Sequence, residues 1–336
     1  MNTKQEILTL PKALADTLEK GQPEYEGLLR RTRWGEGPIY LLASGTSWHA
    51  SLTGVFAFET LLARPAVARA PAVFAAYSMS LLGPGVVVIA ISPHGESSAV
   101  LDVARSARVR GASLLVVTAK PETTVAKMAG GVLRLRTDSQ GSGAAVCEQA
   151  VMGYLALVAA RIFRKHQPQF EVLGKEFGGL PGAIEWVLHQ MSDAVNSLAS
   201  ELTAFRRVYI LGGGFYYPSA LQAEHLFREL GGDAKALDPV ELGTRSMDLH
   251  NGDSVLVAIS GSRCRLRKGI HEALERVSHS GVKILAITDN NDRELTQLSQ
   301  VAVLLPNLTE MIGAVLASAV IHCVAYQMAC HSKCAG

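Results

Sequence analysis

The sequence predicts an α/β protein of two similar domains, each a parallel sheet with helices on both faces. Its strands are continuous runs of Val, Ile and Leu, as at 86–91, which is typical of strands buried on both faces. Helix-compatible segments separate these runs, and that alternation indicates parallel strands joined by helical crossovers. The pattern also occurs twice, at an offset of about 170 residues, so a single duplicated domain explains the chain.

Three pairs of segments carry this repeat. The pairs are 38–49 with 207–218, 85–94 with 254–262, and 111–118 with 281–288. The repeat divides the chain into four parts: a helical lead-in at 1–33, a first domain at 34–165, a linker and helix at 166–205, and a second domain at 206–336.

The elements follow in order from hydrophobic patterning. Residues 1–33 are polar on one side, with Pro11 in a first turn, which indicates a helix. Apolar runs rich in strand formers predict strands at 38–43, 66–74, 86–91, 113–118 and 131–135. The segments between them predict helices at 48–63, 97–110, 122–128 and 144–164. Gly178-Gly179 and Pro181-Gly182 then indicate a linker before the lead-in helix of the second domain.

Composition and charge describe a compact globular chain. Its 336 residues are enough for two domains, and 48% of them are hydrophobic. With 32 basic and 30 acidic residues the net charge is +2, which gives no electrostatic case for a nucleic-acid or membrane-surface partner. The start lacks a secretory signal, and no uninterrupted apolar segment reaches membrane-spanning length, so we expect a cytoplasmic protein.

The cysteines suggest neither disulfides nor a metal site. They are five, an odd number, and none has a Cys-x-x-Cys partner, so we expect reduced thiols. Cys330, His331 and Cys334 form one weak cluster without a second pair of ligands, and we interpret them as helix or tail sequence.

The stretch from Pro38 to Ala50 has the pattern of strand, polar turn and helix. Its turn, 44–47, falls where the first N–H groups of a helix lack intrahelical acceptors and the helix dipole places partial positive charge. The turn, Ser-Gly-Thr-Ser, adds hydroxyl donors, and Gly45 permits a close approach or a positive φ. It is therefore a candidate phosphate site, with an ordinary capped turn as the alternative.

A second polar turn, Ser92 to Ser98, follows the strand that ends at Ile91 and opens the next helix. In one parallel sheet, two such turns can face each other across a crevice at the carboxyl ends of the strands. Ser97 and Ser98 are also good helix caps. Two polar turns in one domain nevertheless favour a phosphate clamp.

The sequences Ser-Gly-Thr-Ser-Trp-His-Ala at 44–50 and Ala-Ile-Ser-Pro-His-Gly-Glu-Ser at 90–97, with the duplication, resemble the sugar isomerase (SIS) domain proteins, and most closely the isomerase half of glucosamine-6-phosphate synthase. The resemblance covers nearly the whole chain. It implies two tandem SIS domains of flavodoxin-like three-layer fold, a phosphorylated sugar or amino-sugar ligand, no metal or organic cofactor, and a homodimer with sites near the subunit interface. The phosphate contacts that it and the two turns predict are Ser44, Gly45, Thr46, Ser47, Ser92, His94, Gly95 and Ser97.

The chain departs from the family pattern around this site. The family's second turn usually reads Ser-Gln-Ser-Gly-Glu-Thr, whereas this chain has Pro93 and His94 in place of the Gln and the second Ser. A protonated His94 could donate to the phosphate instead. The family's Ala-Ser-Thr stretch, which helps to line the sugar site, falls on Ala145, Val146 and Cys147, so that wall is more apolar here. We therefore expect a different substrate.

The segment from Tyr217 to Glu229 resembles the family helix whose final Glu moves a proton between C1 and C2 of the open-chain sugar. The resemblance assigns that role to Glu229, with Glu224 as its rival and a solvated helix residue as the alternative. Such a base usually has its pKa raised by partial burial. Glu241 keeps the Glu of the family's next motif and could line the sugar site, but the His-Gly-Pro that follows it in the family is absent.

Two functions remain open from the sequence. One is an enzyme that interconverts an aldose and a ketose phosphate, with or without deamination or deglycation. The other is a non-catalytic sugar-phosphate sensor that has kept the clamp and lost the acid-base His. Glutamine-dependent amidotransfer by this chain alone is not expected, because position 2 is Asn2 rather than a nucleophilic Cys.

Overall fold

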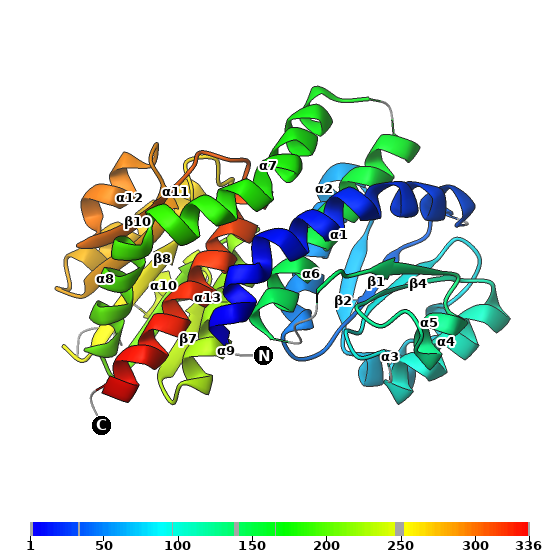
Figure 1. Ribbon diagram of the computed structural model, residues 1–336, viewed down its shortest axis with the longest axis horizontal. Coiled ribbons are helices and arrows are strands. Elements are labelled where there is room, and N and C mark those ends of the chain that lie inside the picture. Colours follow the sequence, from blue (N-terminus) through cyan, green and yellow to red (C-terminus); the bar gives the residue numbers. More distant parts are fainter. Residues whose placement is uncertain are drawn as a thin grey trace. The chain divides into compact units, whose positions relative to one another are not determined.

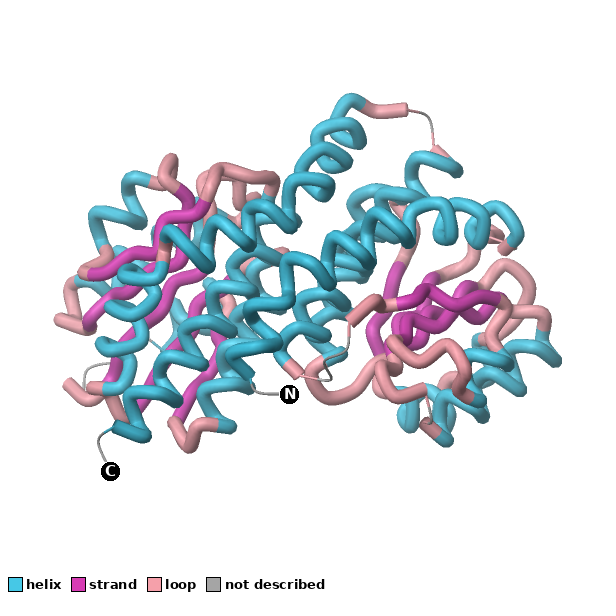
Figure 2. The backbone as a smooth tube through the Cα atoms, viewed as in Figure 1, coloured by secondary structure: helices cyan, strands magenta, loops and turns pink. Residues whose placement is uncertain are grey.

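The computed structural model describes residues 3–32, 34–95, 97–137, 141–164, 166–245 and 252–334 (Figure 1). They divide into two compact units. Unit 1 comprises Thr9–Pro181, and unit 2 comprises the chain from Gly182 onward together with residues 3–8. Each unit is built around one five-stranded parallel sheet with helices packed against it (Figure 2).

Unit 1 holds the first sheet. Its strands are β1 (Ile39–Leu42), β2 (Ala66–Arg69), β3 (Val87–Ile91), β4 (Ser113–Thr118) and β5 (Gly131–Arg134). Its helices are most of α1 (Thr3–Arg31), α2 (Ser47–Leu62), α3 (Pro71–Tyr77), the 3₁₀ turn η1 (Met79–Leu81), α4 (Ser98–Arg110), α5 (Thr124–Met128), α6 (Ser142–Phe163) and the first part of α7 (Pro168–Gln190).

The strand order in unit 1 is β2-β1-β3-β4-β5, and every neighbouring pair is parallel. β1 and β3 are neighbours although β2 lies between them in the sequence. The chain therefore leaves this pair of strands in opposite directions, which makes the pair a topological switch point. Open α/β sheets bind ligands at the carboxyl ends of such strands.

Alternating side chains of each strand face two helical layers. On one face, Tyr40 and Leu42 of β1 share a hydrophobic cluster with Phe74 of α3. On the other face, α2 packs directly on the strand, since a β-carbon at Gly54 would lie 2.4 Å from Leu41 Cδ2. All residues of β1 and β3 are buried, as continuous apolar runs require.

Unit 2 repeats this arrangement. Its strands are β6 (Arg207–Gly212), β7 (Asp233–Leu237), β8 (Ser254–Ile259), β9 (Lys283–Asp289) and β10 (Val301–Leu305), in the order β10-β9-β8-β6-β7. Its further helices are α8 (Ser192–Thr203), α9 (Tyr216–Glu229), α10 (Pro239–Arg245), α11 (Arg267–Ser278), α12 (Arg293–Leu298) and α13 (Glu310–Cys334). The order β7-β6-β8-β9-β10 corresponds to β2-β1-β3-β4-β5, so the predicted fold class of two α/β domains is confirmed.

One predicted strand is too long. The strand expected at 66–74 ends at Arg69, and residues 71–77 form α3. Pro71 occupies the first turn of that helix, where its missing N–H is no loss, whereas a sheet ladder would need the donor.

The segment expected as a linker is helical. α7 continues through Gly178-Gly179 and Pro181, and α8 follows after one residue. Buried Phe170, Phe177 and Ile184 recur at helical spacing along α7, and this packing outweighs the low helix propensity of Gly and Pro. Packing prevails in α1 as well, where Pro11 lies inside the helix and not in its first turn.

Two helices are long and apolar enough to cross a membrane by length and composition: Gly143–Phe163 and Glu310–His331. From the sequence, no apolar segment of that length was expected. Most of each window is buried within the protein, as in the core helices of α/β domains.

Candidate phosphate site

The two polar turns lie side by side at the switch point of unit 1. The register pairs Leu42 of β1 with Ala90 of β3, and Ser44 and Ser92 each follow two residues later. Because the two strands are parallel, both turns lie at the same edge of the sheet, where each strand ends. The β1–α2 and β3–α4 turns are therefore neighbours at that edge, as the sequence predicts.

Glycine shapes the first turn. Gly45 has a φ of +60°, in the left-handed region, and its carbonyl accepts a hydrogen bond from the Trp48 amide (3.1 Å). Thr46 caps α2 by position but makes no side-chain capping bond. Ser44, Gly45 and Thr46 are exposed, whereas Ser47, the first residue of α2, is only 4% exposed. The α2 N-terminus thus lies at the first turn and has no side-chain cap from Thr46.

The second turn folds back on Ser92. The Gly95 amide donates to the Ser92 carbonyl (3.0 Å) and to its hydroxyl oxygen (3.2 Å), and Gly95 has a φ of +67°. Thr118, at the end of β4, donates to the Pro93 carbonyl (3.2 Å) and holds the turn against the next strand. These bonds fix the turn without using the hydroxyl proton of Ser92, which remains able to donate to a ligand.

Ser97 is the N-cap of α4, and its hydroxyl accepts the Val100 amide at 3.4 Å. Capping uses a lone pair and leaves the hydroxyl proton available. His94 is exposed on the same turn. Glu96 lies outside the described residues. Both turns therefore offer hydroxyl and amide donors, as an anion requires.

One buried carboxylate beneath the site was not predicted from the sequence. Glu148 of α6 is 1% exposed, and a hydrogen bond from the side chain of Ser47 reaches its carboxyl. Burial raises the pKa of Glu148 to about 7, and the Ser47 bond offsets part of that rise. The signal was present in the sequence: Glu148 is the only charged residue in the largely apolar run 143–160.

The corresponding end of the second sheet is filled by the protein itself. A β-carbon at Gly261, after β8, would lie 2.5 Å from the Tyr216 hydroxyl oxygen and 2.8 Å from Asp289 Oδ2. Cys264 donates to Glu310 nearby, with 3.3 Å from Sγ to Oε1. Burial raises the pKa values of Tyr216 and Glu310. Because it is filled and lined by carboxylates, this end does not suit a phosphate.

The two candidate bases on α9 have different surroundings. Glu224 is 18% exposed, accepts the Ala236 amide (2.7 Å) and pairs with Arg228 (3.0 Å). Glu229, the last residue of α9, is 62% exposed and lies 3.3 Å from His225 Nε2. Glu224 thus holds α9 against β7, whereas the Glu229 side chain is accessible to solvent.

The family follows from a comparison of this sequence with known protein families. The family model of the SIS domain matches residues 34–162 and again 201–332, which together make up most of the chain. This chain belongs to the SIS domain family. The matches coincide with the sheet-bearing parts of units 1 and 2, so the chain contains two tandem SIS domains.

Similar proteins share the fold over almost the entire chain. A glutamine–fructose-6-phosphate aminotransferase (isomerizing) of Synechocystis is 25% identical over 307 residues, covering 87% of this chain and 48% of that protein. The chain thus spans about half the length of the curated relatives it matches. Among solved structures, the C-terminal domain of the Francisella tularensis glucosamine-fructose-6-phosphate aminotransferase matches with a TM-score of 0.88 at 17% identity, covering 99% and 96% of the two chains. An Escherichia coli tagatose-6-phosphate ketose/aldose isomerase matches with a TM-score of 0.77 at 17% identity, covering 98% and 92%.

The other residues predicted for the SIS site are less exposed to solvent. Ala145 and Val146, expected to line the sugar site, are buried in α6 at 4% and 0% exposure. Glu241 of α10 pairs with Lys235 at 3.5 Å, and His250, which follows this motif in the sequence, lies outside the described residues. Within the described part of the chain, no group of three or more His, Cys, Asp or Glu side chains is placed to hold a metal.

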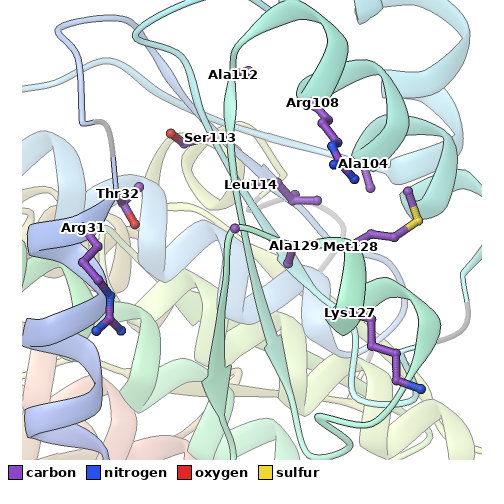
Figure 3. Close-up of a pocket in the computed structure, with 11 residues that line it drawn as sticks. Arg31, Thr32, Ala104, Arg108, Ala112, Ser113, Leu114, Lys127, Met128 and Ala129 are labelled. Carbon is purple, nitrogen blue, oxygen red and sulfur yellow. The ribbon is translucent and has the colours of Figure 1, made fainter.

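A cavity of about 410 Å³ lies elsewhere on unit 1, and Arg31, Arg108 and Lys127 are among its lining residues (Figure 3). Its wall includes Ser113, where β4 begins, and Gly130, which precedes β5. The cavity is therefore at the amino ends of these strands, at the opposite edge of the sheet from the two turns.

Proposed function

We propose that this SIS protein binds a phosphorylated sugar or amino-sugar derivative at the switch point of unit 1 and interconverts its aldose and ketose forms. The observation that carries the proposal is the pairing of two donor-rich turns on adjacent strands, two residues beyond Leu42 and Ala90. Membership of the SIS family and the isomerase named among the solved structures support it.

The donor set suits a phosphate dianion. Ser44, Thr46 and Ser47 come from the first turn and Ser92 and Ser97 from the second, and hydroxyl protons can converge on phosphate oxygens from both. Two helix N-termini, those of α2 and α4, add backbone amides and partial positive charge. The site thus holds the phosphate and leaves the sugar carbons for the chemistry.

Glu229 is proposed as the base. Its carboxylate removes the proton from the carbon next to the carbonyl, and the enediol is reprotonated on the neighbouring carbon. If the substrate carries an amine, the same step generates an enamine, which opens a route to deamination. The exposure of the Glu229 side chain supports this choice, because the Glu224 carboxylate is already engaged by the Ala236 amide.

A sugar-phosphate sensor is the second candidate. Two observations favour it: the His-Gly-Pro of the family is absent after Glu241, and the Glu229 side chain is 62% exposed to solvent. A sensor would bind the same ligands at the same turns and show no turnover.

The first experiment is a thermal-shift screen with fructose, glucose, glucosamine and galactosamine 6-phosphates. One of them should raise the melting temperature by about 2–4 °C at saturating concentration. The double variant Ser47→Ala/Ser92→Ala should lose this shift, whereas Ser80→Ala, an exposed serine of η1, should keep it. A shift retained in the double variant would place the ligand elsewhere.

The second experiment separates enzyme from sensor. The stabilising ligand is incubated with the protein in D₂O, and the mass of the recovered sugar is followed. An isomerase incorporates deuterium at the carbon next to the carbonyl, and Glu229→Gln should abolish incorporation without removing the thermal shift. Binding without incorporation in the wild type supports the sensor.

A further inference from the structure

A buried carboxyl with an unsatisfied oxygen lies beneath the first phosphate turn. Glu148 is 1% exposed, and within the described residues its Oε2 has no hydrogen-bond partner. Buried polar atoms are nearly always paired, and an unpaired carboxylate oxygen is costly, so this one requires an explanation. A purely structural role does not supply one, because an apolar side chain would fill the same space at lower cost.

The Glu148 carboxyl is linked to the proposed phosphate site through one residue, Ser47. Its hydrogen-bond partner is the hydroxyl of Ser47, which begins α2 in the first turn. The helices that carry the two residues, α2 and α6, pack closely, since a β-carbon at Gly54 would lie 3.4 Å from Met152 Sδ. Close packing of α2 on α6 therefore brings the Ser47 and Glu148 side chains within reach of each other.

A serine hydroxyl has one proton to donate. If Glu148 is ionised, it can only accept, so the Ser47 proton points down at Glu148 and not at the ligand. If Glu148 is protonated, its O–H donates to Ser47 Oγ, and the Ser47 proton is directed to the phosphate. An ionised Glu148 would also place a buried negative charge near the dianion.

We propose that Glu148 is a positioning residue of the phosphate site, which must carry a proton when the phosphate binds so that Ser47 donates to the ligand. This inference rests on the proposed function. If the free protein has lost the Glu148 proton, ligand binding must be accompanied by uptake of one proton there. The affinity for the phosphate therefore falls at pH values where Glu148 of the free protein is ionised.

The surroundings place this titration near neutral pH. Burial raises the pKa of Glu148 to about 7. The titratable group that interacts with it, Cys147 on the same helix, has a thiol pKa raised by burial to about 12 and stays neutral. Ser47, which faces it from α2, does not titrate. In the second turn the exposed His94 is also ionisable, and a comparison with Glu148→Gln, which retains His94, separates its effect.

Sulfate is a suitable probe, because it remains a dianion between pH 6.5 and 8.5. Its affinity for the wild-type protein should fall about 20-fold over this range. In Glu148→Gln, whose amide donates at every pH, the fall should shrink to about threefold or less. Glu19→Gln, an exposed carboxylate of α1, should behave like the wild type. Fructose 6-phosphate serves as a second probe.

Calorimetry measures the proton uptake directly. Titration of the wild type with sulfate in two buffers of different ionisation enthalpy should show an uptake of about one proton at pH 8, and Glu148→Gln should show little or none. Sulfate binding with the same pH dependence in wild type and Glu148→Gln, or without proton uptake, overturns this inference and leaves the proposed function standing. Absence of binding by either anion at any pH overturns both.

Discussion

Gly95 packs directly against Thr123: a β-carbon at Gly95 would lie 2.1 Å from the Thr123 hydroxyl oxygen. The Thr123 hydroxyl donates to the Lys120 carbonyl (2.9 Å), and the Gly95 carbonyl accepts the Val125 amide (3.3 Å). The β3–α4 turn is thereby fixed to the loop that follows β4. The position of Ser92 and Ser97 at the site depends on this contact.

Gly95→Ala should therefore disrupt the turn. The left-handed φ of +67° costs about 1–2 kcal/mol for alanine, and the clash with Thr123 adds to that cost. We expect a lower melting temperature and loss of the thermal shift with phosphosugars. Gly83→Ala is the matched control, because nothing lies within 4 Å of a β-carbon there, and it should change neither quantity.

Changing each of the two glutamates of α9 to glutamine should distinguish their roles. Glu224→Gln weakens the Arg228 pair and the bond from the Ala236 amide, so unit 2 should lose about 1–2 kcal/mol in denaturant unfolding. Glu229→Gln removes an exposed charge and should leave stability within about 0.5 kcal/mol while abolishing deuterium incorporation. The reverse pattern would exchange the roles of the two residues.

Much of this fold could be predicted from the sequence because its strands are buried on both faces. The run of β4 was predicted with its observed bounds, since a continuous apolar stretch bounded by polar residues leaves little choice of ends. The prediction was wrong where tertiary packing overrode a local signal. Gly178-Gly179 and Pro181 are typical of loops, but the buried stripe of α7 keeps them helical.

The candidate site was predictable as turns but not as a three-dimensional environment. Ser44 and Ser92 follow their strands, so topology alone brings them together. Glu148 is about 100 residues from Ser47 in the sequence, and its contact depends on how α6 packs on α2, which no local pattern specifies. In the same way, only the packing shows that Tyr216 and Asp289 fill the second switch point.

That second switch point gives a further prediction. Asp289 accepts the amides of Ser262 (2.6 Å) and Asn291 (2.9 Å) on its two oxygens, and an asparagine side chain at this position could accept only on one. Asp289→Asn should lower the free energy of unfolding by about 1–3 kcal/mol, with the affinity for phosphosugars unchanged. Asp253→Asn, an exposed position, should have no effect on stability. A lost affinity in Asp289→Asn would assign a ligand to unit 2.

Glu148 should also make stability depend on pH. Its carboxyl loses its proton near the usual pKa of 4.5 in the unfolded chain and at about 7 in the folded protein. Between these values the folded state binds more protons, so raising the pH through this window lowers the free energy of unfolding. A difference of this size corresponds to at most about 3 kcal/mol, and the loss is complete above pH 7.

Glu148→Gln removes this titration while conserving volume. Compared with the wild type, the variant should therefore become relatively more stable as the pH rises from 5 to 8, by about 3 kcal/mol at most, measured by denaturant unfolding at both pH values. Glu19→Gln, fully outside the core, should show no such change. If the difference between wild type and Glu148→Gln were the same at pH 5 and pH 8, Glu148 would be ionised in both states throughout, and the Ser47 proton would then point at it at every pH in this range.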